Sequence, residues 1–386
     1  MKNSFFGTGR RKAGLLLLLA LPFAGALAQD HTLATITLKN PSDRERVNEV
    51  VEISWKEIVL KHPAIDTAGF KVVDAATRQE LPCQLDHSGG NGIQNLLVQL
   101  SFKPGGERNL DLVAGHRAPV VSKVYGRYVP ERYDDFAWEN DLVAHRMYGK
   151  ALESRPDNAF GTDVWVKKTS KLVINDWYKR GDYHTDHGDG MDYYSVGFTL
   201  GAGDIAPYVN DSVIFSKNYH FWKVLDNGPL RVSFQLGYDA WDVAGRQVKV
   251  IKTISLDAGS RMNRVAAVYS FKGAEPLPVV IGVVKRKEAG TVLMGEQQGL
   301  LGYWEPPHAE DGITGVGTIA VSPVSGMDMD RVHLMTHVMA QNNVPVVYYH
   351  GSAWSKGGSI TNDRQWFDYL QDFNARMKQP VIVQVR

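Results

Sequence analysis

Apolar and polar residues alternate with a period of two through most of the chain, which is the pattern of strands that bury one of their two faces. The segment 32–39, TLATITLK, is the first example. Sequences rich in Gly, Pro, Asn and Ser, such as 40–42 and 103–106, separate these segments and predict turns. Further early strands are predicted over 50–55, 70–73, 95–102 and 108–113. Together they predict a small β-sandwich-like portion over residues 29–116.

From residue 136 the alternating segments become longer and more aromatic. Strands are predicted over 142–148, 193–198, 212–219, 230–238, 247–256, 261–271, 279–285, 300–304, 317–321, 333–339 and 344–349. Many long strands with few helices favour an all-β fold. We predict an antiparallel β-supersandwich over residues 117–386, and we expect this part to carry the functional site.

One late segment has helical periodicity instead. Thr361 or Asn362 provides an N-cap, and Pro380 marks the end of the helix. Its apolar face consists of Trp366, Tyr369, Leu370, Phe373 and Met377. A last strand is predicted over 381–385. The fold is therefore predicted to contain a few short helices beside its strands.

The N-terminus has the three parts of a secretory signal peptide. Basic residues up to Lys12 precede an apolar segment over 15–23, and Ala26 and Ala28 form a small-x-small cleavage site. The apolar segment is too short to span a bilayer. We therefore expect residues 1–28 to be cleaved, the mature protein to be periplasmic or secreted, and the chain to have no membrane span.

The overall composition narrows the choice of partners. A formal net charge of +1 gives no electrostatic footprint for nucleic acid, so none is expected as a partner. The single cysteine, Cys83, excludes an intramolecular disulfide. Abundant aromatic residues suit sugar binding, although they are also common in β-sheets. The composition does not indicate an oligomeric state.

The densest polar motif runs from Tyr183 to Tyr194 and contains two histidines and three aspartates within nine residues. His184 and His187 are candidate acid/base residues because a histidine beside a carboxylate titrates near neutral pH. Asp186, His187 and Asp189 are candidate ligands of a metal ion, although their spacing matches no zinc or calcium signature. A solvated polar loop is the third interpretation.

A second motif surrounds the predicted strand 142–148. Alternation places Arg146 and Tyr148 on one face of that strand and His145 on the other. A guanidinium suits a carboxylate and a phenol donates a proton, so this face is a candidate for binding an anionic sugar. The alternative is a structural arginine paired with a nearby acid such as Glu139.

Weaker candidates are polar or aromatic residues scattered over the second half of the chain. Arg286 belongs to a basic run that also fits a solvated strand end. Trp354 is expected in a loop before the late helix, as a platform for a sugar or a lid on the core. The predicted substrate contacts are His145, Lys217, Asn218, Trp241, Arg286 and Trp354.

Taken as a set, the motifs resemble an exported bacterial family called domain of unknown function 4861. The motifs are WEND at 138–141, HRMYG at 145–149, DVWVK at 163–167, YHxDHGxG at 183–190, NGP at 227–229, LDAGS at 256–260 and GxxW at 351–354. The resemblance covers nearly the whole mature chain. One departure is Lys150, where the family often has proline.

The resemblance implies a galactose-mutarotase-like supersandwich that occurs with enzymes degrading pectin and other uronate polysaccharides. It does not choose a reaction, because this fold group contains epimerases, hydrolase accessory domains and lyase domains. The alternatives to a lyase or dehydratase are therefore a mutarotase-like epimerase, a glycoside hydrolase and a non-catalytic carbohydrate-binding protein.

Our leading hypothesis is β-elimination on an oligosaccharide that contains uronic acid. Arg146 would neutralise the carboxylate, His184 or His187 would remove the C5 proton, and Tyr148 or Tyr193 would protonate the leaving group. Asp186 or Asp189 would orient the histidine. We expect either no cofactor or a divalent cation, calcium or zinc, that replaces the arginine.

Overall fold

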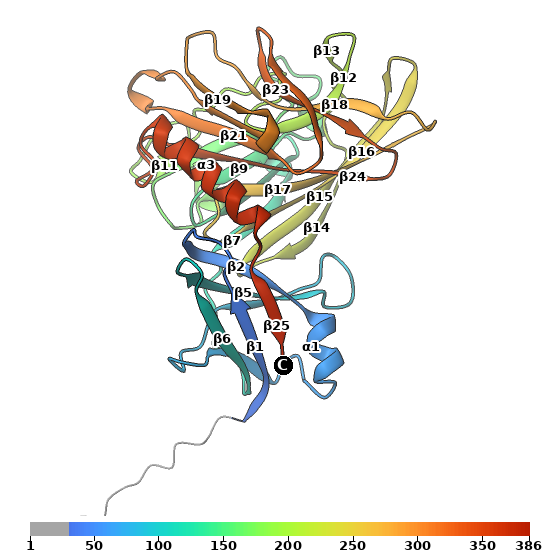
Figure 1. Cartoon of the computed structure of the whole chain (residues 1–386). Helices are drawn as coiled ribbons and strands as arrows, with labels where there is room; N and C mark the ends of the chain where they lie inside the picture. The colour runs from blue at the N-terminus through green and yellow to red at the C-terminus, as the bar shows by residue number, and fades with distance from the viewer. Residues whose placement is uncertain (1–30) are drawn as a thin grey trace, which may run out of the picture. The chain divides into compact units, whose positions relative to one another are not determined.

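The long alternating segments form an eight-stranded antiparallel sheet in the computed structural model, which describes residues 31–386 (Figure 1). The predicted signal peptide, residues 1–28, lies outside the described residues. In spatial order the strands are β14 (Phe221–Asn227), β15 (Arg231–Val243), β16 (Arg246–Asp257), β17 (Met262–Phe271), β24 (Pro345–Trp354), β21 (Thr314–Ala320), β20 (Leu300–Trp304) and β19 (Thr291–Gly295).

A second antiparallel sheet packs against the inner face of the eight-stranded one. Its strands, in order, are β13 (Ser212–Val213), β12 (Asp204–Val209), β18 (Leu277–Val284), β23 (His333–Ala340) and β22 (Val324–Met329). Val250 and Tyr348 from the first sheet meet Ile281 and Val338 from the second in one buried cluster. Two stacked antiparallel sheets with few helices confirm the predicted β-supersandwich.

The N-terminal strands form two further sheets with a core of their own. The first has the order β25 (Ile382–Val385), β1 (Thr32–Lys39), β6 (Glu107–Ala114) and β3 (Phe70–Asp74), and the second has the order β2 (Arg46–Ser54), β5 (Asn95–Phe102) and β4 (Cys83–Asp86). Ile36, Ile53 and Leu96 are buried between them. The boundary at residues 116 and 117 stays a prediction, and the structure adds that the last strand of the chain pairs with β1 (Figure 1).

A fifth sheet forms from residues 124–191, near the start of the predicted portion 117–386. Its order is β11 (Gly190–Met191), β10 (Asp163–Lys167), β9 (Ala144–Met147), β8 (Asp135–Asn140) and β7 (Val124–Val129). Phe136, Trp138 and Met147 point from one face into the core of the supersandwich. The opposite face carries polar side chains, so this sheet positions a candidate site.

In the described part of the chain the helices are few and short, as predicted. They are α1 (Trp55–Lys61), α2 (Ile174–Arg180), α3 (Asp363–Lys378) and the 3₁₀ turns η1 (Pro130–Arg132), η2 (Lys150–Leu152), η3 (Glu296–Gln298) and η4 (Ala309–Asp311). Asn362 caps α3 by accepting a hydrogen bond of 3.0 Å from the Gln365 amide, which confirms one of the two predicted caps. Among residues 31–386 no helix is long and apolar enough to cross a membrane.

Three local predictions were wrong. The segment 193–198 is not a strand, because Gly197 has a φ of +59° and breaks the extended backbone. Of 212–219 only Ser212–Val213 is a named strand, where it pairs with the end of β12. Trp354 ends strand β24 and is not in a loop, because its backbone pairs with Thr314.

A buried ion pair fixes the sheet that carries the site to helix α2. Glu139 and Lys167 have fully buried side chains, and Lys167 Nζ lies 2.8 Å from Glu139 Oε2. The same carboxylate accepts hydrogen bonds of 2.8 Å from the backbone amides of Val173 and Ile174. It therefore also satisfies amides at the N-terminus of α2 that have no partner within the helix. Glu139 is thus structural and does not pair with Arg146.

We expect Glu139→Gln to lower the free energy of unfolding by about 3–5 kcal/mol, because it leaves the Lys167 ammonium buried without its counter-charge. Denaturant unfolding followed by tryptophan fluorescence measures the loss. Adding Lys167→Met to the first change should recover part of the stability. The control Glu131→Gln, which breaks an exposed pair with Arg127, should cost less than about 1 kcal/mol. Equal losses in the two single variants would contradict the role of burial.

Candidate functional site

Strand register places one arginine beside acidic residues from neighbouring strands. Arg146 on β9 is paired with Asp163 on β10, and directly opposite strand residues point to the same side of a sheet. The partner of Arg146 on β8 is Ala137, and Asp135 lies two residues before Ala137. Asp135 therefore points to the same face of the sheet as Arg146. Tyr148 lies two residues further along the chain than Arg146 on the same side, whereas His145 points to the core. The predicted alternation of this strand is therefore confirmed.

The Arg146 guanidinium contacts three aspartates. Its Nε and Nη2 lie 2.9 and 2.5 Å from Asp163 Oδ2, and Nη2 also lies 3.0 Å from Asp192 Oδ2. Its Nη1 is 3.6 Å from Asp135 Oδ2 and has no hydrogen-bond partner in the described part of the chain. All four side chains are almost completely buried. We call these residues, Asp135, Arg146, Asp163 and Asp192, the Arg146 cluster.

The Arg146 cluster contains more acids than its single arginine can neutralise. Burial raises the pKa of Asp135 to about 7, against the opposing effect of the Arg146 charge. Burial and the neighbouring Asp163 raise the pKa of Asp192 well above its usual value, and burial also raises that of Asp163. Burial opposes the charge of Arg146, but Asp163 and the other acids keep its pKa above its usual value. The cluster therefore retains protons at pH values where exposed aspartates have lost theirs.

Aromatic rings cover part of the Arg146 cluster. Trp165 stacks on Trp177 of α2 at 5.5 Å and on Tyr183 at 5.0 Å, measured between ring centroids. The Arg146 guanidinium lies 5.4 Å from the Trp165 ring and 5.0 Å from the Tyr148 ring. These rings keep water from the ion pairs, which strengthens the electrostatic interactions among them.

Three polar side chains connect the Arg146 cluster to solvent. The His184 side chain is 60% exposed, and its Nδ1 lies 2.8 Å from the Asp192 carbonyl oxygen and 3.6 Å from its carboxylate. Arg132 is half-buried and donates from Nε to the Tyr183 hydroxyl at 2.8 Å. Tyr148 is also half-buried, and burial raises its pKa well above the usual value, so its hydroxyl stays protonated. We call His184, Arg132 and Tyr148 the rim.

Glycine is required at position 149, just after the chain leaves strand β9. A Cβ atom on Gly149, the residue after Tyr148, would lie 1.9 Å from the Asp134 carbonyl oxygen. Such an approach is possible only for a residue without a side chain. Asn218 is buried and donates to the Gly149 carbonyl oxygen at 3.2 Å. This predicted substrate contact therefore supports the backbone behind Tyr148 instead of facing solvent.

A second polar cluster follows Asp192 along the chain. Arg286 Nε lies 2.8 Å from Glu305 Oε1, its Nη1 donates to the Ser195 carbonyl oxygen at 2.6 Å, and its guanidinium lies 4.5 Å from the Tyr194 ring. Burial raises the pKa of Glu305 to about 7. The Tyr193 hydroxyl lies 2.6 Å from Thr314 Oγ1 and is half-buried. Arg286 is thus a partnered residue, unlike the solvated strand end that its basic neighbours suggested.

The loop with two histidines mostly stabilises itself. Asp186 accepts hydrogen bonds from Lys168 at 2.6 Å and from the Gly188 amide at 2.8 Å. His187 Nε2 lies 3.2 Å from Asp182 Oδ2, and Asp189 accepts a hydrogen bond of 3.1 Å from the Trp177 indole. Within residues 31–386 no three His, Cys, Asp or Glu side chains are grouped to hold a metal ion. The predicted ligand set is therefore not assembled, and a cation requirement stays a prediction.

The remaining predicted residues form their hydrogen bonds and ion pairs with groups outside the rim. His145 is fully buried on the core side of β9, where its Nε2 lies 3.0 Å from Asn263 Nδ2. The Lys217 side chain is 78% exposed and lies 3.8 Å from Glu153. Trp241 packs half-buried against the supersandwich core, and the buried Trp354 donates its indole N–H to the Asp311 carbonyl oxygen at 2.8 Å. His145 Nδ1 also lies 3.3 Å from the Asp163 carbonyl oxygen, and Trp354 packs in the same apolar cluster as Tyr148.

Four important residues were missed by sequence reasoning. Arg132 and Asp135 lie in a stretch for which no strand or motif was predicted, and Asp163 begins a short strand that was not predicted. Glu305 follows a predicted strand without a motif around it. The DVWVK segment offered the one available signal, because alternation places Asp163 and Trp165 on a common face.

Comparison with known proteins identifies one family and a shared fold. The family model described as "Domain of unknown function (DUF4861)" matches residues 38–383. A protein of Formosa agariphila named "Uncharacterized protein P7" is 32% identical over 389 residues, which cover 94% of this chain and 96% of that protein.

Two solved structures from Enterococcus faecalis resemble the fold. One is a protein in glycosyl hydrolase family 38, with a TM-score of 0.54 and 10% identity, covering 92% of this chain and 47% of that one. The other is an α-mannosidase, with a TM-score of 0.50 and 8% identity, covering 92% of this chain and 46% of that one. This chain thus spans about half the length of each, and the likeness at this identity concerns the fold alone.

The raised pKa of Asp135 predicts a stability that falls as the pH rises. Between about pH 4 and pH 7 the folded protein keeps a proton on Asp135 that the unfolded chain releases. The contribution of protonated Asp135 to the free energy of unfolding is therefore fully present below this interval. As the pH rises through the interval, this contribution is lost at up to about 1.4 kcal/mol per pH unit. Urea unfolding at pH 5 and pH 7 should show a smaller decline for Asp135→Asn than for the unmodified protein.

The control for this measurement is Asp176→Asn, at an exposed position in the first turn of α2. It should keep the pH dependence of the unmodified protein. An Asp135→Asn protein whose stability declines as steeply as that of the control would show that Asp135 ionises normally in the folded state.

Proposed function

The chain belongs to the DUF4861 family, and from this premise we propose that it is an enzyme that acts by β-elimination on oligosaccharides containing uronic acid. The observation that carries the proposal is the rim, where an arginine, a histidine and a protonated tyrosine are linked through Tyr183 and the buried Arg146 cluster. These are the three chemical parts that the reaction needs. The names of the two similar structures, both of glycoside-processing proteins, support a carbohydrate as the substrate.

Contacts through intervening residues connect the three rim residues and support a single reaction centre. Arg132 donates to the Tyr183 hydroxyl, and the Tyr183 ring lies 4.6 Å from the His184 ring. His184 contacts Asp192, which in turn contacts Arg146 below the Tyr148 ring. One continuous set of contacts therefore links the three rim groups.

We assign the binding of the uronate carboxylate to Arg132 instead of Arg146. The Arg146 side chain is 6% exposed and its charge is already surrounded by three aspartates. Arg132 is half-buried, and its two terminal nitrogens have no hydrogen-bond partner among residues 31–386. A guanidinium with free N–H groups suits a planar carboxylate. Arg146 acts as a positioning residue that holds Asp192 beside His184.

In the proposed reaction, His184 removes the C5 proton while Arg132 stabilises the negative charge that develops on the carboxylate. The electrons of the C5–H bond form the C4–C5 double bond, and the C4–O bond breaks with its electrons on oxygen. Tyr148 donates its proton to that oxygen. Its raised pKa makes it an acid that is fully protonated before the reaction. Asp192, and not Asp186 or Asp189, lies beside the histidine and orients it.

The arrangement favours elimination over hydrolysis by paired carboxylates. A glycoside hydrolase needs two carboxyl groups on either side of a bound sugar. Asp163 and Asp192 both contact the same nitrogen of Arg146, and both are buried. Glu305, an acid with a raised pKa outside the Arg146 cluster, is 7% exposed and bonded to Arg286. No sugar ring fits between groups that are already joined by a guanidinium.

The proposal predicts a rising ultraviolet absorbance from the conjugated acid when the protein is incubated with oligogalacturonates or glucuronate-containing oligosaccharides. Tyr148→Phe and His184→Ala should each lower the initial rate by about 10²- to 10⁴-fold with little change in substrate affinity, because each removes a proton-transfer group. The matched control is His187→Ala, in the same loop but bonded to Asp182, which should keep its rate.

Further measurements distinguish the alternatives to this reaction. If a chelator abolishes the absorbance signal, a divalent cation neutralises the carboxylate. If the chelator leaves the rate unchanged and Arg132→Met loses activity, Arg132 neutralises it. A flat absorbance across all uronate substrates, with new reducing ends by chromatography, would replace elimination by hydrolysis. Binding without any product would leave a carbohydrate-binding protein.

A further inference from the structure

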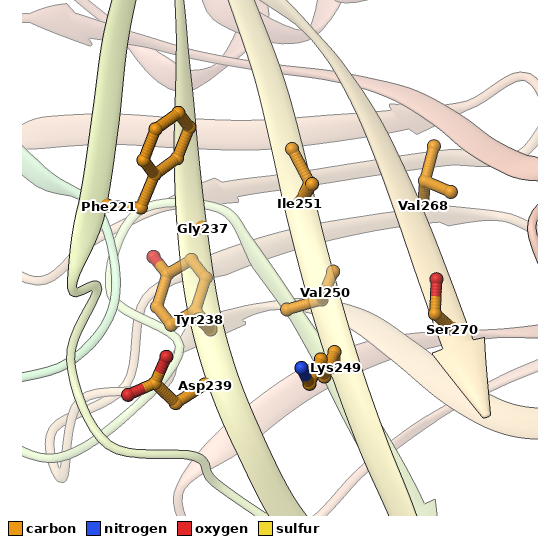
Figure 2. A pocket seen from close by; sticks show the side chains of 9 residues that line it. All are labelled: Phe221, Gly237, Tyr238, Asp239, Lys249, Val250, Ile251, Val268 and Ser270. Carbon is orange, nitrogen blue, oxygen red and sulfur yellow. The ribbon is translucent and has the colours of Figure 1, made fainter.

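A hollow of about 210 Å³ lies on the outer face of the eight-stranded sheet and includes none of the rim residues (Figure 2). It crosses strands β14, β15, β16 and β17. The residues that line its outer face are Phe221, Gly237, Asp239, Lys249, Ile251, Val268 and Ser270. The hollow is therefore distinct from the candidate reaction centre and needs its own explanation.

Strand register arranges the apolar residues of the hollow in one row. Phe221 pairs with Gly237, Gly237 with Ile251, and Ile251 with Val268, so the row crosses four strands at one level. Phe221 is 50% exposed and Ile251 is 44% exposed, which is unusual for large apolar side chains on an open sheet face. The row presents a flat apolar strip to solvent.

Gly237 creates the depth of the hollow. A Cβ atom at this position would lie 3.1 Å from Cδ1 of Phe221, so the aromatic ring leans over the glycine. The register shift between Tyr238 and Trp241 interrupts the pairing of β15 directly after this point. A bulge of this kind turns the following side chain, here Asp239, relative to a regular strand.

Polar rows border the apolar row on both sides. Asp239, Lys249 and Ser270 lie on one side, where Lys249 pairs with Ser270. Gln235 and Thr253 lie on the other, joined by a hydrogen bond of 3.2 Å. An apolar strip one row wide between polar rows matches a pyranose ring, which has an apolar C–H face and polar groups around its edge.

The charged groups at the border differ in their availability. Asp239 Oδ2 is bonded to His220 Nδ1 at 2.8 Å, and His220 Nε2 contacts Glu153 at 2.6 Å. Lys249, in contrast, forms no hydrogen bond or ion pair with any other residue between 31 and 386. The free cation beside the apolar strip favours a sugar with a carboxylate over a neutral one.

We propose that this hollow is a second carbohydrate site, which binds one uronic-acid unit of an oligosaccharide away from the reaction centre. The C–H face of the sugar packs on Phe221 and Ile251, and its carboxylate pairs with Lys249. Helix α3 packs on β20 and β21, towards the opposite edge of the same sheet from β14 (Figure 1). The inference extends the proposed function, because it takes the same substrate class.

The test titrates the full mature chain carrying His184→Ala, which prevents turnover, with a short oligogalacturonate by isothermal titration calorimetry. Two binding events are expected. Phe221→Ala, Gly237→Leu and Lys249→Met, each added to this background, should remove one event or weaken it about tenfold or more, because each removes packing area, space or charge. Lys249→Met keeps the backbone and the hollow, so its result does not depend on the folding of Gly237→Leu.

Two controls test the assignment. Met339→Ala, an equally exposed apolar residue on β23, should keep both binding events. A neutral oligosaccharide of the same length should bind to this site more weakly than the oligogalacturonate, because it has no carboxylate to pair with Lys249. Lys249→Met should therefore not weaken the binding of the neutral oligosaccharide further. If Lys249→Met has no effect on oligogalacturonate binding, or if neutral and acidic sugars bind equally, the uronate assignment is overturned.

The outcomes for this site and for the reaction centre are separable. A protein without elimination activity whose oligogalacturonate binding still depends on Phe221 and Lys249 would support the second site and reject the proposed reaction. A protein with elimination activity and only one binding event, lost in Arg132→Met and unchanged in Phe221→Ala, would overturn the second site and keep the reaction.

Discussion

The buried contact between Arg146 and three aspartates organises the candidate site. A guanidinium taken out of water needs partners for its N–H groups, and Asp163 and Asp192 provide them for Nε and Nη2. Three buried acids in turn exceed the charge of one arginine, so the cluster keeps protons that exposed acids release. The position of His184 follows from this arrangement, because it contacts the backbone and lies beside the carboxylate of Asp192.

The sheet formed by β7 to β11 separates two chemical environments. Its inner face places Trp138, Met147 and His145 in the supersandwich core, and its outer face holds the Arg146 cluster under aromatic rings. Because successive residues of a strand point to opposite sides, one short strand contributes to both. The Glu139–Lys167 pair then fixes this sheet to α2, which provides part of the aromatic cover. Stability and candidate chemistry therefore depend on the same few strands.

The sequence was most informative about local pattern and least about long-range partners. It predicted the all-β supersandwich, the cap of α3 at Asn362 and the alternation that separates Arg146 from His145. It overvalued the loop with two histidines, since dense titratable residues in a loop also serve to hold that loop together. There Asp186 bonds to Lys168 and to backbone amides.

The sequence by itself determined which face of each strand a residue occupies, because that depends on a backbone period of two residues. Only the tertiary structure decided which acids meet Arg146, because the partners Asp135, Asp163 and Asp192 come from strands and a loop whose register depends on pairing across many residues. The same holds for the hollow around Gly237, whose row of residues exists only when four strands pair at one level.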